Sequence, residues 1–303
     1  MTIPIAGIPT QLNALDTYTR SATTYLYTYK YSAPLTVGTK DLKCRVYVGE
    51  GWTTYTPRPC AVLMSTLGFA ITSTDDEPLV RDYADFFVRS GCVFIVADSR
   101  VQADNPTNPD DAALGITGDL AARTVNALID DCKHLYQWVT GVRALSPWCI
   151  EPKWVFPFGA SAGAMGWLFM CQKYPWLADR IPGLICAAVA YGYDANPTYE
   201  TAIRSTLGYT EADHDAGDPP VCAFLGGADT ILGVTRIADF KAVLDGLGAP
   251  GVVHYDADGG HETALTFDLT ALTNAATMAE AMKDFIDART AVIERSRSCL
   301  LIT

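Results

Sequence analysis

The feature that most constrains the fold of this chain is a series of short apolar runs separated by amphipathic segments. The uninterrupted apolar runs lie at residues 59–65, 92–98, 154–158, 184–192, 221–227 and 251–255. Runs of this length without polar alternation are typical of strands that are covered on both faces of a parallel sheet. Two earlier runs, 26–32 and 42–49, alternate between polar and apolar residues and are predicted to be solvated edge strands.

The segments between the apolar runs have the spacing of amphipathic helices. In residues 76–91 the apolar side chains fall on one face, and Gly91 can end the helix. The other predicted helices are residues 120–139, a segment that starts after residue 161, residues 237–247 and residues 274–295. Strands that alternate with helices predict an α/β fold, with a mostly parallel sheet of about eight strands and helices on both faces.

No stretch rich in Pro, Gly or Ser divides the chain, so residues 1–303 are predicted to form a single domain. Two segments, 1–24 and 194–220, fit the strand–helix pattern poorly. We expect both to be cap segments over the carboxyl edge of the sheet, where ligands bind in open α/β folds.

A single serine stands between glycines where a predicted strand gives way to a predicted helix. The residues are Gly159-Ala160-Ser161-Ala162-Gly163, which fit the pattern G-x-S-x-G. A tight strand-to-helix turn would lift the hydroxyl clear of the sheet, and the helix N-terminus would favour developing negative charge. The alternative is that the glycines only allow a helix start to pack closely on a strand. The placement favours Ser161 as a nucleophile.

A serine nucleophile needs a base, and the chain has four histidines. His134 lies on the polar side of a predicted helix, His214 lies in an acidic segment where solvation is expected, and His254 lies inside a predicted strand. His261 follows that strand in a glycine-bearing loop, from which a side chain can reach back over the sheet edge. His261 is therefore the predicted base.

The acid that orients the base is predicted to be Asp229, just after the apolar run 221–227. An aspartate there can accept a hydrogen bond from the imidazole Nδ1–H and fix its tautomer. Asp229 could instead be a turn former or a helix N-cap. Asp256 and Asp258 are competing candidates, because they are close to His261 in sequence.

Ser161, Asp229 and His261 each follow a successive late apolar run. In this order the chain resembles the α/β-hydrolase superfamily, in which a nucleophile-elbow serine precedes the acid and the histidine. The resemblance covers residues 25–295. Residues 130–139 and 92–101 also look like the matching segments of carboxylesterases of the hormone-sensitive-lipase type, and dienelactone hydrolases are a further similar group.

The resemblance implies an oxyanion hole built from backbone N–H groups. The His-Gly-Gly-Gly motif of those esterases is replaced here by Ser65-Thr66-Leu67-Gly68-Phe69, and Ala160 stands where they usually have Asp. Leu67, Gly68 and Ala162 are the expected donors. The Leu67 side chain should narrow the approach for bulky acyl groups and tertiary alcohols.

The implied activity is hydrolysis of a small to medium carboxylic ester through an acyl-serine, without a metal or other cofactor. Lactonase, thioesterase, peptidase, carbon–carbon hydrolase and acyltransferase or other biosynthetic activities remain alternatives within the same fold. A ligand receptor without turnover is an alternative from another class. The predicted substrate-binding residues, which could equally be core residues, are Phe69, Trp167, Tyr191, Tyr193, Ile231 and Leu232.

Charge and cysteine content indicate the partners and the compartment. A net charge of −12 disfavours binding to nucleic acid or to anionic membranes. The N-terminal residues lack the pattern of a secretory signal, and no apolar run is long enough to span a bilayer. The nine cysteines lie mostly within apolar runs and lack metal-site spacing. We expect a cytoplasmic enzyme that acts on a small-molecule ester, possesses no metal site and can form a homodimer.

Overall fold

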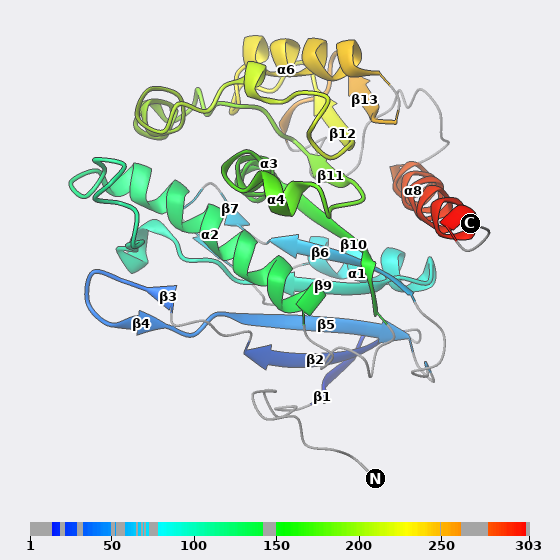
Figure 1. The fold of residues 1–303 in the computed structure, drawn as a ribbon. Coiled ribbons are helices and arrows are strands. Elements are labelled where there is room, and N and C mark those ends of the chain that lie inside the picture. Colours follow the sequence, from blue (N-terminus) through cyan, green and yellow to red (C-terminus); the bar gives the residue numbers. More distant parts are fainter. Residues whose placement is uncertain are drawn as a thin grey trace.

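The computed structural model describes residues 14–18, 22–28, 33–49, 52, 58–64, 66–67, 69, 71–72, 78–141, 150–248, 250–261 and 278–300. Nine strands form one sheet, which runs through the middle of the molecule (Figure 1). Its order is β1 (Ala14–Tyr18), β2 (Ala22–Thr28), β5 (Lys43–Gly49), β9 (Val93–Ala97), β6 (Arg58–Met64), β10 (Ile150–Ala160), β11 (Leu184–Ala187), β12 (Val221–Gly226) and β13 (Val252–Asp256).

The strands from β9 to β13 pair in parallel, whereas β1, β2, β5 and β9 pair antiparallel. Two small antiparallel pairs lie outside this sheet: β3 (Ala33–Pro34) with β4 (Thr39–Lys40), and β7 (Thr66–Leu67) with β8 (Ile71–Thr72). The predicted apolar runs form the parallel part of the sheet, so their lack of polar alternation is explained by burial on both faces.

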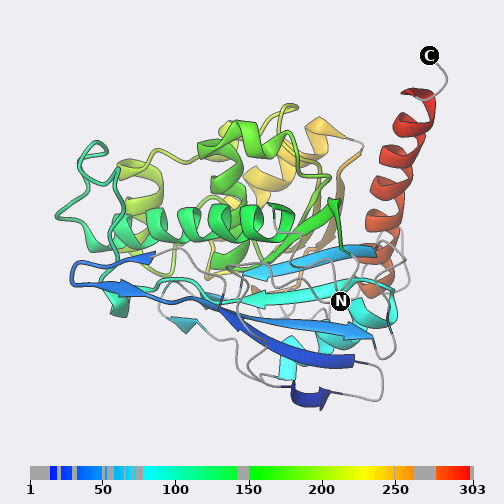
Figure 2. The same ribbon diagram turned by 60° about the horizontal axis from the view of Figure 1, so that its bottom comes forward.

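Helices cover both faces of the sheet. α2 (Leu120–Gly141), α3 (Ala162–Lys173) and α6 (Val234–Leu247) pack in one core cluster, and α1 (Pro78–Arg89) and α8 (Met278–Leu300) pack in the other. In Figure 2, α2 lies on one side of the sheet and α1 on the other. Shorter helices are α4 (Pro175–Ala178), α5 (Pro197–Glu200), the 3₁₀ turns η2 (Gln102–Asp104) and η5 (Glu211–Asp213), and the π-helical η4 (Thr201–Thr206). The predicted α/β fold with a mostly parallel sheet is confirmed.

The N-terminal strands differ from their predicted role. Within the segment 1–24, residues 14–18 form β1 and residues 22–24 begin β2, whereas residues 1–13 and 19–21 lie outside the described residues. β1 and β2 are an antiparallel hairpin in which Tyr18 pairs with Ala22. Because this hairpin extends the sheet, the described part of 1–24 is sheet edge and not a cap over the carboxyl ends.

The same hairpin buries β5, which the alternating pattern had assigned to a solvated edge. β5 lies between β2 and β9. Cys44, Val46 and Val48 contribute to the core cluster on one face, and Tyr47 contributes to the cluster on the other. β5 is therefore an internal strand, because the edge position is taken by β1.

A buried ion pair fixes the loop that follows β9. Arg100 and Asp131 are both almost completely enclosed. The Arg100 backbone N–H donates to Asp131 Oδ2 (2.6 Å), and its guanidinium Nη2 lies 2.8 Å from Asp131 Oδ1. The Nη1 group donates to the carbonyls of Pro34 and Thr107. One side chain thus ties α2 to the loop that starts at residue 98 and to the segment before β4.

The described cysteines behave as buried apolar residues. None of the seven cysteines whose side chains are described forms a disulfide, and all seven are buried: Cys44, Cys60, Cys92, Cys132, Cys171, Cys186 and Cys222. Burial raises the pKa of the Cys92 thiol to about 12. These thiols therefore stay protonated near neutral pH and contribute to packing.

Candidate active site

Ser161 occupies the turn between β10 and α3. Its backbone has φ 52° and ψ −124°, a combination that residues other than glycine rarely adopt. The Ser161 N–H donates to the carbonyl of Ala187 at the end of β11 (2.9 Å), and the Ser161 carbonyl accepts from the Ala164 N–H (3.0 Å). The turn therefore holds the hydroxyl at the carboxyl end of a central strand, next to the N-terminus of α3.

The glycine that precedes this turn is required by space. A Cβ atom at Gly159 would lie 2.6 Å from the carbonyl carbon of Gly163, and still closer to the backbone of Ala164. No side chain atom fits at that distance from backbone. Gly159 thus lets the first turn of α3 pack directly against β10.

Three predicted residues from separate segments meet at the turn. His261 Nε2 lies 3.1 Å from Ser161 Oγ, and His261 Nδ1 lies 2.7 Å from Asp229 Oδ2. When Nδ1–H donates to the carboxylate, Nε2 is unprotonated and accepts the hydrogen bond of the serine hydroxyl. Asp229 is fully buried, and His261 and Ser161 expose only 9% and 5% of their surface. The arrangement has the geometry of a Ser–His–Asp triad.

The loop after β12 holds Asp229 in place. Its other oxygen, Oδ1, accepts from the backbone N–H groups of Ile231 (2.9 Å) and Leu232 (3.0 Å). The carboxylate is therefore satisfied on both oxygens although water is excluded, and burial does not leave its charge uncompensated. Of the competing carboxylates, Asp256 Oδ1 accepts from the backbone N–H of Asp258, so it caps its own loop.

The loop that carries His261 packs against the end of β12. The Ala228 N–H donates to the Gly259 carbonyl (2.9 Å). A Cβ at Gly226 would lie 2.6 Å from the Gly260 carbonyl oxygen and closer still to that of Gly259. This close backbone contact brings the acid and the imidazole within bonding distance.

The other histidines lie away from this site. His134 is half-buried on α2, and burial with the nearby Lys133 lowers its pKa. His254 is fully buried in β13, where its ring stacks on Phe224 with centroids 4.9 Å apart. Burial lowers the pKa of His254.

His214 was expected to be solvated, and that expectation is wrong. The side chain is buried, its Nδ1 lies 3.3 Å from Asp218 Oδ2, and its ring contacts Phe240 of α6. Long-range packing of the acidic segment against α6 explains the difference.

The predicted oxyanion donors are only partly described. Ala162 is the first residue of α3, where backbone N–H groups have no intrahelical acceptor and the helix dipole favours negative charge. Leu67 ends β7, which contacts α3, and pairs with Ile71 of β8. Gly68 lies outside the described residues. Ala162 therefore lies at the helix N-terminus directly after Ser161, and β7 lies beside the same helix.

Phe69, which lies between β7 and β8 in the sequence, belongs to an aromatic cluster. Phe69 stacks on Tyr199 of α5, with ring centroids 4.7 Å apart and planes inclined by 14°, and both rings contact Tyr193. Phe69 and Tyr193 were predicted as substrate-binding residues, whereas Tyr199 was not singled out. The sequence Asn196-Pro197 signals a helix start, which places Tyr199 in a first turn but does not reveal its partner.

The remaining predicted substrate residues divide into two groups. Ile231 is half-buried beside Asp229. Trp167, Tyr191 and Leu232 are fully buried. The Trp167 indole donates to the Phe158 carbonyl (2.8 Å), and the Tyr191 hydroxyl accepts from Gln172 (2.6 Å). Trp167 and Tyr191 therefore lie in the core beneath the site.

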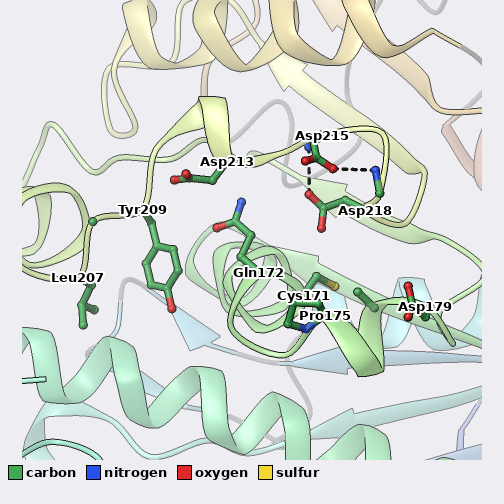
Figure 3. A pocket seen from close by; sticks show the side chains of 12 residues that line it. Cys171, Gln172, Pro175, Asp179, Leu207, Tyr209, Asp213, Asp215 and Asp218 are labelled. Carbon is green, nitrogen blue, oxygen red and sulfur yellow. Dashed lines mark hydrogen bonds between the residues drawn. The ribbon is translucent and has the colours of Figure 1, made fainter. Parts of the chain in front are cut away.

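A separate surface cavity of about 560 Å³ lies at the C-terminal end of α3 (Figure 3), and its lining includes none of Ser161, Asp229 and His261. Three of the four aspartates that line it accept backbone hydrogen bonds within their own loops. Asp215 accepts from the Gly217 N–H, Asp218 accepts from the Asp215 N–H, and Asp213 accepts from the Thr210 N–H. This cavity thus results from how residues 207–218 fold back on α3, and it is distinct from the serine site.

Within the described segments no group of three or more His, Cys, Asp or Glu side chains could hold a metal ion. No helix in the same part of the chain has the length and apolar character of a membrane span.

The sheet order, the serine turn between β10 and α3 and the loops that carry Asp229 and His261 define an α/β-hydrolase fold. Solved structures of Thermogutta terrifontis esterase 2 share it. The form phosphorylated by paraoxon aligns with a TM-score of 0.59 at 17% identity, over 88% of this chain and 91% of that one. The butyrate-bound form aligns with a TM-score of 0.57 at 17% identity, over 89% and 93% of the two chains.

The sequence matches no protein-family model and no curated protein. At 17% identity the structural similarity establishes the fold. The chemistry of the site is therefore argued from this chain's own residues.

Proposed function

We propose that this protein is a serine hydrolase that cleaves small to medium carboxylic esters through an acyl-serine intermediate. The observation that carries the proposal is the continuous chain of contacts from Asp229 through His261 to the Ser161 hydroxyl. Because a serine hydroxyl is a weak nucleophile on its own, this chain supplies what it needs: a base within reach and a group that orients the base.

In the first half-reaction, Ser161 Oγ attacks the ester carbonyl carbon while His261 Nε2 takes the hydroxyl proton. The buried carboxylate of Asp229 keeps the proton on Nδ1 and stabilises the imidazolium that forms. The tetrahedral intermediate then collapses: the bond to the alcohol oxygen breaks, and His261 returns its proton to that oxygen.

Negative charge develops on the former carbonyl oxygen during both half-reactions. The Ala162 N–H at the start of α3 is the donor whose position supports this role best, and the backbone N–H groups of residues 67 and 68 are the proposed partners. Preorganised donors of this kind act strongly where water is excluded.

In the second half-reaction, a water molecule takes the place of the departed alcohol. His261 accepts a proton from the water, the oxygen attacks the acyl carbon, and the acid product leaves as Ser161 Oγ regains its proton. The cycle requires no metal and no organic cofactor.

An apolar acyl group of modest size is the proposed substrate feature. Phe69 follows β7, which contacts α3, and its ring contacts that of Tyr193; rings beside the start of α3 would favour apolar over charged acyl groups. The similarity to an esterase whose structure was solved with butyrate agrees with this size class.

The test combines turnover with covalent labelling. We expect the protein to hydrolyse p-nitrophenyl butyrate and to react once with paraoxon, with the mass increase confined to the peptide that contains Ser161. Ser161→Ala should abolish both, whereas Ser205→Ala, at an exposed serine on η4, should change neither.

Full hydrolysis by Ser161→Ala, or labelling of another residue, would overturn the proposal. The same assay with thioesters, lactones and aminoacyl amides compares the rates for these substrates with the rate for esters. A competing alcohol shows whether the acyl group passes to water or to the alcohol.

A further inference from the structure

We propose that Tyr199 and Gln102 are positioning residues that hold the Phe69 turn and, through it, the oxyanion donors that precede Phe69. This role rests on the proposed ester hydrolysis and deepens it. Neither residue touches the reacting atoms, so both act through Phe69.

Phe69 is held in a backbone conformation that it would not adopt alone. Its φ is 62°, in the left-handed region, although it is a bulky residue and almost fully buried. Such a conformation persists only when surrounding contacts impose it. Phe69 directly follows residues 67 and 68, so any movement of its backbone also moves their N–H groups.

Three contacts close a ring around Phe69. The backbone N–H of Gln102 donates to the Phe69 carbonyl (3.1 Å). The Tyr199 ring stacks on the Phe69 ring at 4.7 Å. The Tyr199 hydroxyl donates to Gln102 Oε1 (3.2 Å). Burial raises the pKa of Tyr199 to about 12, so its hydroxyl keeps the proton that it donates. The main chain and the side chain of Phe69 are thereby held by two residues that also hold each other.

Gln102 is itself anchored to the body of the protein. It lies two residues after Arg100, whose buried ion pair with Asp131 fixes the loop to α2. In the same 3₁₀ turn, Asp104 accepts from the Val101 N–H (2.9 Å) and pairs with Lys40 (2.5 Å). Gln102 therefore offers a fixed point for the Phe69 carbonyl.

Tyr199 is anchored through the rest of α5. Its neighbour Glu200 accepts from the Tyr193 N–H (2.6 Å) and lies 3.1 Å from Arg236 of α6. The Tyr199 ring is thus held from the side of the segment 194–220, and Gln102 from the side of α2. Phe69 lies between these two supports.

The chemical consequence follows from the tolerance of an oxyanion hole. Its donors must lie about 3 Å from the developing oxyanion, and a misplacement of about 1 Å can cost about 100-fold in rate. A role in transition-state stabilisation should therefore appear in kcat with little change in KM.

The experiment uses four variants assayed with p-nitrophenyl butyrate. Tyr199→Ala removes the stacked ring and should lower kcat about 10–100-fold, with KM changed by less than about 3-fold. Tyr199→Phe and Gln102→Ala each remove the shared hydrogen bond, and Tyr199→Phe also removes a contact of the hydroxyl with Thr124; each should lower kcat about 2–5-fold. The double variant Tyr199→Phe/Gln102→Ala should be no slower than the slower single variant, because the shared bond is lost in all three.

Two further readouts separate positioning from general destabilisation. Affinity for butylboronic acid, which forms a tetrahedral serine adduct, should fall in parallel with kcat, while the pH profile of kcat/KM keeps its wild-type shape. The matched control is Tyr209→Ala, which removes an equally stacked ring (4.4 Å from Phe169) from the same segment without touching Phe69. It should lower the thermal midpoint but leave kcat unchanged.

The proposal is overturned if Tyr199→Ala keeps wild-type kcat, if the two single effects multiply in the double variant, or if Tyr209→Ala loses as much kcat. In any of these cases the proposed ester hydrolysis still stands, provided that the wild-type protein reacts with paraoxon at Ser161. A wild type that neither hydrolyses esters nor reacts with paraoxon at Ser161 would overturn both.

Discussion

Asp229 and His261 are joined through a single carboxylate oxygen: Oδ2 lies 2.7 Å from the imidazole Nδ1, while Oδ1 is taken by two backbone N–H groups of the acid's own loop. The two oxygens therefore have separate tasks. One orients the imidazole, and the other fixes the loop that carries the carboxylate.

This division predicts the effect of Asp229→Asn. The amide oxygen can keep the two loop hydrogen bonds, but the amide NH₂ then faces His261 and favours the tautomer with the proton on Nε2. We expect kcat to fall about 10³–10⁴-fold with little loss of thermal stability. Steady-state kinetics and a thermal melt check both parts.

The control for this prediction is Asp258→Asn, at an exposed carboxylate near His261 in sequence. Its kcat should equal that of the wild type. If the two variants behaved alike, Asp229 would not be the acid that orients the base.

Gly159→Ala should disrupt the serine turn. The added methyl group would collide with the backbone of residues 163 and 164, and backbone cannot yield as a side chain can. Overpacking of this kind costs about 1–3 kcal/mol in the free energy of unfolding. Ester hydrolysis should fall with it, because the turn sets the position of Ser161. Urea denaturation and kinetics measure the two effects.

Gly246→Ala in α6 is the matched substitution, since a Cβ there meets nothing within 4 Å. An alanine in a helix is more stable than a glycine by about 1 kcal/mol, so this variant should gain stability and keep its activity. A loss of stability in Gly246→Ala equal to that in Gly159→Ala would contradict the steric explanation.

Asp131→Ala should be strongly destabilising. It leaves the enclosed guanidinium of Arg100 without its carboxylate, and breaking a buried pair in this way costs about 3–5 kcal/mol. Chemical denaturation provides the measurement. Lys241→Ala, which breaks an exposed pair with Asp245 on α6, should change the free energy of unfolding by no more than about 0.5 kcal/mol.

The burial of His254 predicts that the stability of the protein depends on pH. Burial lowers its pKa in the folded state, so below about pH 6.5 the unfolded chain binds a proton that the folded chain does not. The free energy of unfolding should therefore decrease as the pH falls from 6.5 toward the folded-state pKa, by up to about 1.4 kcal/mol per pH unit.

His254→Phe keeps a planar ring on Phe224 and removes the titration. Urea denaturation of both proteins between pH 7.5 and about 5 should show that the free energy of unfolding decreases less for the variant than for the wild type as the pH falls. A difference that stays constant over this range would show that His254 does not titrate differently in the two states.

The parts of the site that the sequence could predict are those where chemistry and local backbone agree. The turn at Ser161 lies between a strand and a helix that are evident from apolar spacing, and His261 is the histidine in a loop at the right edge. Asp229 follows from the same edge. Local pattern suffices here because each residue is placed by the end of its own strand.

Features that depend on distant partners could not be predicted in this way. Whether β5 is an edge or an internal strand depends on the hairpin of β1 and β2, and the burial of His214 depends on Phe240. The stacking of Tyr199 on Phe69 joins residues far apart along the chain. Spacing within one segment contains no information about such contacts.

Ile231 links the start of the segment 194–220 to the acid: its carbonyl accepts from the Ala195 N–H (3.0 Å), and its own N–H holds Asp229. If the segment 194–220 moved about a hinge at this end, the movement would displace the Asp229 carboxylate from His261. Ester and product should therefore enter and leave the site elsewhere, and substitutions meant to change the acyl specificity should leave residues 194–196 unaltered.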